Sequence, residues 1–348
     1  MLERFGVIEQ DTTARDRFLD ILNPQRQLRE ALRRTTARNI NQTVNIQFDG
    51  TSLSWEENKC YESRGKSVIS LVDSAFSQMT EQEKAEMKPF SVPFFLGDRP
   101  DVVPGFSRQY PFSFASCDYH DELIPDFNFD RWVEVGLNDY EEVCREMIQR
   151  AKDSPIIDKL FWIGNSETHP TRDQFCRLVE GDARIDAINI CSWNKTKYSK
   201  QLTTGNGKYV SIPDHCNYKY LIDLQGAGYS GRVKYLLHSG RPLFYQERQW
   251  NEYWFFSMKP FVHYIPFKED LSDFYEQFEW ALNNEEKCQE IARNALVFAN
   301  THLRRQNAVH RYKEILLRLG GKWQINPTSR KTSRVSPDHE ASSSIRSK

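Results

Sequence analysis

The sequence predicts an α/β protein built from two facing domains, with a helical C-terminal end. Short apolar runs typical of buried strands alternate with amphipathic segments typical of helices along much of the 348-residue chain. This alternation indicates helices layered on mainly parallel sheets. A break at Ser154-Pro155 separates two such series, so we place the boundary between the domains near residue 155.

The first series contains the less regular elements. A basic helix is expected at 12–38, and further helices are expected around 75–87 and 139–151. Short strands are expected at 44–48, 92–96 and 110–114.

The second series is more regular, and a glycine-rich turn lies near its centre. Its expected strands are residues 160–163, 187–191, 218–225, 242–245 and 263–267. Apolar residues at helical spacing then predict three helices, whose faces carry Leu271, Phe274, Phe278 and Leu282, then Cys288, Ile291, Ala295 and Phe298, then Val309, Tyr312, Leu316 and Leu319. The last helix is expected to end at Gly320-Gly321, and the polar residues 326–348 are expected to be disordered.

Composition excludes several classes of partner. The net charge is -1 with 27% charged residues, so no overall basic field suggests binding to nucleic acid. No apolar run approaches the roughly 20 residues that a membrane-spanning helix needs. The first residues contain acids and no apolar core, so they do not predict a secretory signal, and we expect a cytoplasmic protein.

The turn at 226–231 is the main candidate for a binding site. A strand, a glycine-rich turn and a helix N-terminus favour an anion, because backbone N–H groups and the helix dipole meet there. Arg232 adds a planar cation suited to phosphate oxygens. The same letters, GAGYSG, match the dinucleotide fingerprint, with Glu247 about 20 residues on. A nicotinamide- or flavin-dependent oxidoreductase and a purely structural turn therefore remain alternatives.

A series of motifs resembles glycosyltransferase family 90, the family of capsule-associated proteins and protein O-glucosyltransferases and xylosyltransferases. Residues 214–221, DHCNYKYL, resemble its D-H-C-x-Y-K-Y-L signature, and residues 230–234 are similar to its S-x-R-x-K. Residues 259–266, KPFVHYIP, and 270–273, DLSD, continue the likeness in the same order. Residues 119–125 resemble its Y-H-D-x-x-x-P segment.

The resemblance implies the GT-B arrangement of two facing Rossmann-like domains. Residues 1–155 would then form an acceptor-side domain carrying the catalytic base, and residues 156–305 would form the sugar-nucleotide domain. Residues 306–325 would form a final helix that packs back on the N-terminal domain, followed by the tail at 326–348.

The resemblance also implies an inverting transfer of xylose or glucose from a UDP-sugar to a hydroxyl group of a glycan or glycoconjugate. Asp121 would be the general base, with His120 as an alternative, and the donor would bind Ala227, Gly228, Tyr229, Ser230, Gly231 and Arg232. The chain has no D-x-D motif, so no metal and no cofactor are expected.

One position departs from the family pattern. Ile163 occupies the place of an arginine that helps to hold the nucleotide in relatives, and Asn165 and Ser166 offer replacement hydrogen bonds. This departure leaves the identity of the donor open. A non-catalytic glycan-binding descendant is a further alternative; its expected sign would be loss of the Asp121 position, which is present.

Overall fold

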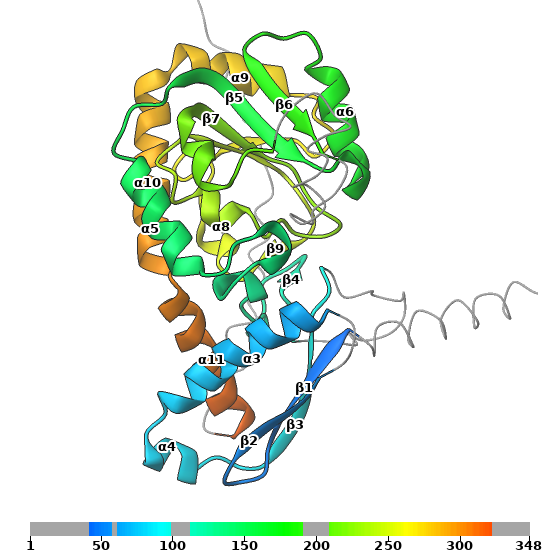
Figure 1. The fold of residues 1–348 in the computed structure, drawn as a ribbon, viewed down its shortest axis with the longest axis vertical. Helices are drawn as coiled ribbons and strands as arrows, with labels where there is room; N and C mark the ends of the chain where they lie inside the picture. The colour runs from blue at the N-terminus through cyan, green and yellow to red at the C-terminus, as the bar shows by residue number, and fades with distance from the viewer. Residues whose placement is uncertain (1–41, 58–60, 99–111, 191–208, 322–348) are drawn as a thin grey trace, which may run out of the picture.

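The computed structural model describes residues 42–57, 61–98, 112–190 and 209–321, and two main sheets divide these residues into two halves (Figure 1). The helix expected at 12–38 and the tail expected at 326–348 lie outside the described residues. So do residues 110, 111 and 191, which belong to two expected strands.

A five-stranded parallel sheet organises the half formed by residues 157–283, which we call the parallel half. Its strand order is β10-β8-β7-β5-β6. The strands are β5 (Ile157–Gly164), β6 (Ile185–Asn189), β7 (Tyr218–Asp223), β8 (Leu243–Gln246) and β10 (Ile265–Phe267). All five lie where the apolar runs predicted them, because a parallel sheet covered on both faces needs nearly continuous apolar strands.

Alternate residues of the central strands pack on opposite faces of this sheet. Leu160 and Trp162 of β5 join one hydrophobic cluster with Phe274 and Phe278 of α9 (Phe274–Asn283). Phe161 and Ile163 join the other cluster. Helix α6 (Pro170–Leu178), which was not predicted, covers the first face through Phe175. The alternation follows from the two-residue period of a strand.

The first sheet is antiparallel, so two facing Rossmann-like domains are not confirmed. Strands β1 (Thr43–Phe48), β2 (Leu53–Glu57) and β3 (Phe90–Phe95) pair in the order β2-β1-β3, all antiparallel. Only residues 49–52 join β1 to β2, which is too short for the crossover that parallel strands require. We call residues 42–98 the antiparallel half.

Helices of the antiparallel half lie earlier than predicted. Helix α3 spans Glu62–Ser77, and residues 78–80 separate it from the next helix, α4 (Glu81–Ala85). The single helix expected around 75–87 is therefore wrong. Thr80 explains the break, because its side chain and that of Glu83 form a reciprocal capping box that starts a new helix.

Residues 112–139, which we call the connecting segment, join the two halves. Residues 112–114 are not a strand, but β4 (Ala115–Ser116) pairs antiparallel with β9 (Asn251–Glu252), between the two main sheets (Figure 1). Helix α5 (Tyr140–Arg150) follows, close to its predicted place, with Asp139 as its cap. The remaining short elements are η1 (Phe127–Phe129), η2 (Val133–Val135), η3 (Ser166–Thr168), η4 (Pro213–Asn217), α8 (Val233–Leu236) and η5 (Phe255–Ser257).

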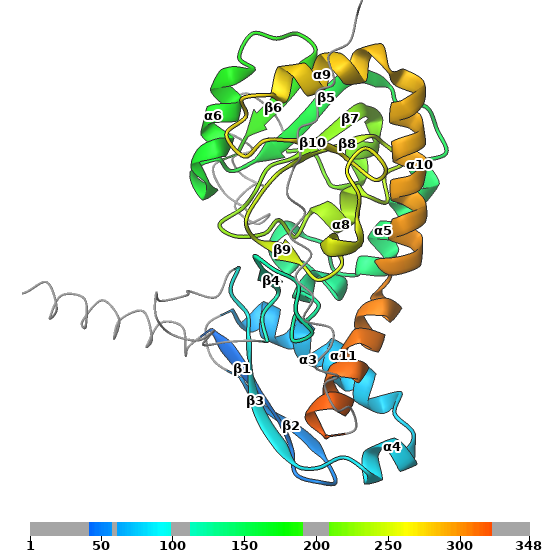
Figure 2. The same cartoon turned by 180° about the vertical axis from the view of Figure 1, so that it is seen from behind.

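The C-terminal helices run from one half to the other. Figure 2 shows α10 (Glu285–His302) along the parallel half and α11 (Arg305–Leu319) beside α3 and the antiparallel sheet. Tyr312 of α11 is fully buried, and its hydroxyl donates to the carbonyl of Pro125 at 2.6 Å. Phe274 and Phe278 are buried as predicted, whereas Leu282 is 37% exposed and does not share their packing.

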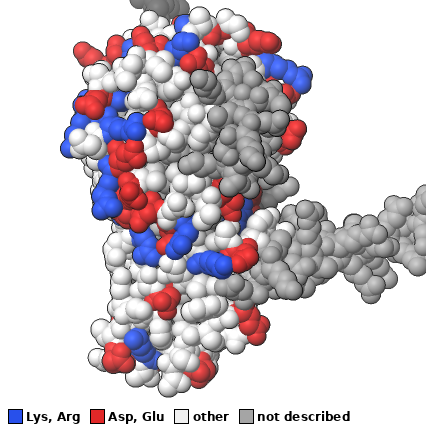
Figure 3. All heavy atoms as spheres, in the orientation of Figure 1, with Lys and Arg blue, Asp and Glu red and all other residues white. Residues whose placement is uncertain are grey.

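Charges are mixed over the molecular surface. On the face shown in Figure 3, lysine and arginine side chains alternate with aspartate and glutamate over the described residues. The described residues on this face therefore form no extended patch of one sign.

Candidate functional site

The glycine-rich turn lies between β7 and α8, at the carboxyl end of a central strand of the parallel sheet. Its glycines allow close packing: a Cβ on Gly226 would lie 2.8 Å from the carbonyl oxygen of Tyr229, and one on Gly231 would lie 2.1 Å from the Nδ2 atom of Asn128. Helix α8 has only four residues. The expected contribution of a helix dipole is therefore small, and any anion site here depends on side chains and turn amides.

A cavity of about 370 Å³ lies at this turn, and both halves of the protein line it. Of the predicted donor-binding residues, the cavity lining includes Ala227, Tyr229, Ser230, Gly231 and Arg232 but not Gly228. Its other wall contains Tyr61, Arg64, Asp98, Phe127, Asn128, Trp132 and Glu134. Such a volume is typical of small-molecule sites.

Arg232 reaches the cavity but is held by neighbouring groups. Its guanidinium bonds the Oδ1 atom of Asp223 through Nη2 at 3.3 Å and donates to the carbonyl of Ile163. Arg248 pairs with the Oδ2 atom of the same Asp223 at 2.8 Å. Burial lowers the pKa of Arg232. Two arginines thus share one carboxylate, which leaves a net positive charge behind the turn.

Arg172 is a second buried cation in the cavity lining, and sequence reasoning missed it. Its guanidinium donates to the carbonyls of Gln225 at 2.7 Å and Leu224 at 3.2 Å. Burial and the charge of Arg232 lower its pKa to about 9. An anion in the cavity would relieve this repulsion between cations. The signal in the sequence was weak, because Arg172 lies within the first turn of the unpredicted helix α6.

Ile163 and the two residues that could replace the missing arginine, Asn165 and Ser166, have structural contacts instead. The Ile163 side chain is buried in the core. Asn165 caps η3 by accepting from the Glu167 backbone N–H at 2.9 Å, and the Ser166 backbone N–H donates to Asn189 at 3.1 Å. None of the three is part of the cavity lining. Arg172 is better placed to supply the missing charge.

The opposite wall of the cavity begins at the N-terminus of α3. Tyr61 has φ 63° and ψ 46°, a left-handed conformation that is rare for a non-glycine residue. The Arg64 guanidinium packs 4.4 Å from the centre of the Tyr61 ring and pairs with Asp98 at 2.9 Å. Strained backbone of this kind is concentrated at binding sites.

Asp121 lies outside the lining of this cavity. Its side chain is 47% exposed, with Oδ1 accepting from the Tyr119 hydroxyl at 3.2 Å. The guanidinium groups of Arg311 and Arg318 donate to its backbone carbonyl at 2.8 and 2.6 Å, which fixes this loop against α11. His120, the alternative base, lies 3.2 Å from Glu122. Asp121 is therefore not one of the residues that line this cavity, and its role as base stays a prediction.

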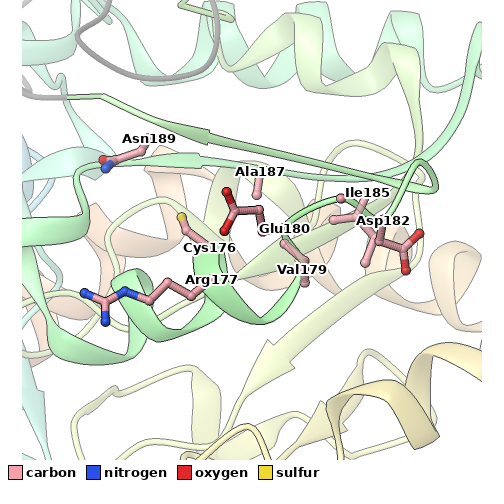
Figure 4. A pocket seen from close by; sticks show the side chains of 9 residues that line it. Cys176, Arg177, Val179, Glu180, Asp182, Ile185, Ala187 and Asn189 are labelled. Atoms are coloured by element: carbon pink, nitrogen blue, oxygen red, sulfur yellow. The ribbon is translucent and has the colours of Figure 1, made fainter.

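A second hollow, of about 340 Å³, lies between α6 and β6 (Figure 4). Arg177 and Asp182 point to opposite sides of it. Because its charged groups do not converge, it has no feature of a specific polar site.

The described residues offer neither a metal site nor a membrane-spanning helix. They contain no group of three or more histidine, cysteine or acidic side chains placed to hold a metal ion. None of their helices combines the length and apolar character needed to cross a membrane.

Comparison with known proteins places these features in a family. The model of glycosyl transferase family 90 matches residues 27–343. The chain is 29% identical over 247 residues to protein O-glucosyltransferase 1 of Rattus norvegicus, covering 67% of this chain and 63% of the rat protein. It is 26% identical over 340 residues to protein O-glucosyltransferase 1 of Homo sapiens, covering 94% of this chain and 82% of the human protein.

Among solved structures, the chain is similar to Anabaena HepE in complex with UDP-glucose. The TM-score is 0.35 with 11% identity, over 54% of each chain.

Proposed function

Since this chain belongs to glycosyltransferase family 90, we propose that it transfers glucose from UDP-glucose to a hydroxyl group of a glycan or glycoconjugate. Glucose is favoured over xylose because the similar rat and human proteins are named O-glucosyltransferases. We further propose that the transfer inverts the configuration at the sugar carbon and needs no metal.

One observation carries the proposal: two buried arginines, Arg172 and Arg232, line the same cavity as the glycine-rich turn. Arg248 adds a third positive charge, whereas Arg232 and Arg248 share only the carboxylate of Asp223. A diphosphate in the cavity would balance this excess and would accept charge-assisted hydrogen bonds. Such donors would also stabilise the diphosphate as it leaves, a task that many enzymes give to a metal ion.

Asp121 is proposed as the general base. Its carboxylate is open to solvent on the loop that follows β4, so an acceptor hydroxyl must approach from outside the cavity. A carboxylate in this position takes a proton as the acceptor oxygen attacks the sugar carbon. A single displacement of this kind inverts the configuration at that carbon.

The alternatives are weaker. Family membership and a one-turn α8 disfavour the dinucleotide oxidoreductase, whose fingerprint requires a full helix behind the turn. A non-catalytic glycan-binding protein would bind UDP-glucose without turnover.

The test is hydrolysis of UDP-glucose, which needs no knowledge of the acceptor. The protein should release UDP and β-glucose, observed by NMR, and Asp121→Asn should slow this about 10²–10⁴-fold because general-base catalysis is lost. The matched control is Asp118→Asn, an exposed aspartate in the same loop, which should keep the parent rate. Release of α-glucose would disprove inversion, and an unchanged rate for Asp121→Asn would move the base elsewhere.

A further inference from the structure

Glu134 is a carboxylate of the cavity wall that faces the glycine-rich turn, and no motif pointed to it. It lies in η2 of the connecting segment and lines the cavity with Ser230 and Arg232. Its Oε2 atom is buried and has no hydrogen-bond partner among the described residues. A buried carboxylate oxygen without a donor is costly, so it marks a place where a ligand can supply one.

The rest of this side chain is held in place. The Ser63 hydroxyl, in the first turn of α3, donates to the Oε1 atom of Glu134. Ser63 lies between Tyr61, with its left-handed backbone, and Arg64, which is paired with Asp98. The nearby guanidinium is therefore already paired, and Oε2 stays available to a neutral donor.

We propose that Oε2 of Glu134 accepts a hydrogen bond from a hydroxyl group of the sugar nucleotide. This inference rests on the proposed function and names the residue that recognises the donor's hydroxyl groups. The glycine-rich turn and the two arginines bind the negative part of the ligand, where a carboxylate would be repelled. On the opposite wall, a carboxylate meets the part rich in hydroxyl groups. A hydroxyl group suits the Oε2 atom of Glu134 because the hydroxyl group is neutral, and because the hydrogen bond that it donates to a charged carboxylate is strong.

Two parts of the ligand carry such hydroxyl groups, the ribose and the transferred sugar. Calorimetry with UDP-glucose, UDP and 2′,3′-dideoxy-UDP separates them. Glu134→Ala should weaken UDP-glucose binding about 10- to 100-fold, the scale of a hydrogen bond to a charged group. If the transferred sugar is the partner, UDP binding is unchanged. If the ribose is the partner, UDP binding falls equally. In both cases dideoxy-UDP, which lacks the hydroxyl groups, should bind the variant as it binds the parent.

Two further variants guard against a folding defect. Ser63→Ala keeps the carboxylate but removes its anchor, and it should weaken UDP-glucose binding by a smaller factor. Glu142→Ala, an exposed glutamate of α5, should leave all three affinities at the parent values. Unchanged UDP-glucose affinity in Glu134→Ala would overturn the inference, and so would an equal loss for all three ligands. If the parent protein binds none of them, the proposed function itself is wrong.

Discussion

His215 should make the stability of this protein fall as the pH falls. The side chain is buried, its Nδ1 atom donates to the carbonyl of Ser211 at 2.7 Å, and its ring packs edge-on against Phe161. Its Nε2 atom is buried with no partner among the described residues. Burial, followed by the charge of Arg232, lowers the pKa of His215 to about 3. The neutral ring is therefore the form that the folded state accepts.

The direction and size of the effect follow from this pKa. The unfolded chain takes up a proton near pH 6.5, whereas the folded chain does so only near pH 3. Between these values the unfolded state binds more protons, so stability decreases as the pH decreases. At pH 5, about 1.5 units below the unfolded pKa, the loss is about 2 kcal/mol, since each unit corresponds to about 1.4 kcal/mol.

Urea unfolding followed by tryptophan fluorescence at pH 8 and pH 5 measures this loss. Other groups also titrate in this range, so the relevant quantity is the difference between the parent and His215→Gln. The parent should lose about 2 kcal/mol more than the variant over this interval. The control, His310→Gln, changes a histidine whose side chain is 68% exposed and should follow the parent. Equal losses in the parent and His215→Gln would refute the assignment of a neutral, buried His215.

Three further predictions concern the charged groups of the site and its surroundings. Lys234 is fully buried, and its ammonium group pairs with Asp126 at 3.0 Å and Glu252 at 2.9 Å. Lys234→Met should therefore lower the free energy of unfolding by about 3–5 kcal/mol, because two buried carboxyl groups are left without their cation. Thermal and urea unfolding measure this loss, and a loss below about 1 kcal/mol would contradict the prediction. Arg172→Ala should weaken UDP binding about tenfold or more through a lost charge-assisted contact, and an unchanged affinity in calorimetry would remove Arg172 from the proposed site. UDP-glucose hydrolysis should survive EDTA, and complete loss that manganese or magnesium restores would disprove metal independence.

Local patterns were sufficient for the parallel half. The strands from β5 to β10 are short apolar runs between turn residues, and burial on both faces leaves such runs little alternative. Helices α10 and α11 were predictable for a related reason, because their apolar faces repeat at the helical period. The motifs around the turn also sufficed to identify the family.

The antiparallel half could not be predicted in the same way. Strand β2, LSWEE, has few apolar residues and lies at the sheet edge, so it shows no clear pattern. The break before α4 depends on one capping box rather than on a change in hydrophobicity. The expectation of a second parallel sheet came from the family resemblance. The short turn between β1 and β2 excludes a parallel pairing of these two strands.

The sequence by itself determined the family, the position of the turn and the residue types around it. Only the tertiary structure decided which charged groups meet in the cavity at this turn. Arg172 and Arg232 lie 60 positions apart in the sequence, and Glu134 belongs to the opposite wall of the cavity. It also placed Asp121 against α11, through Arg311 and Arg318, rather than in the cavity. The role of Asp121 as general base stays a prediction, as do the domain boundaries and the cytoplasmic location. Motifs record residue types along the chain, whereas burial, pairing and pKa depend on neighbours that folding brings from distant segments.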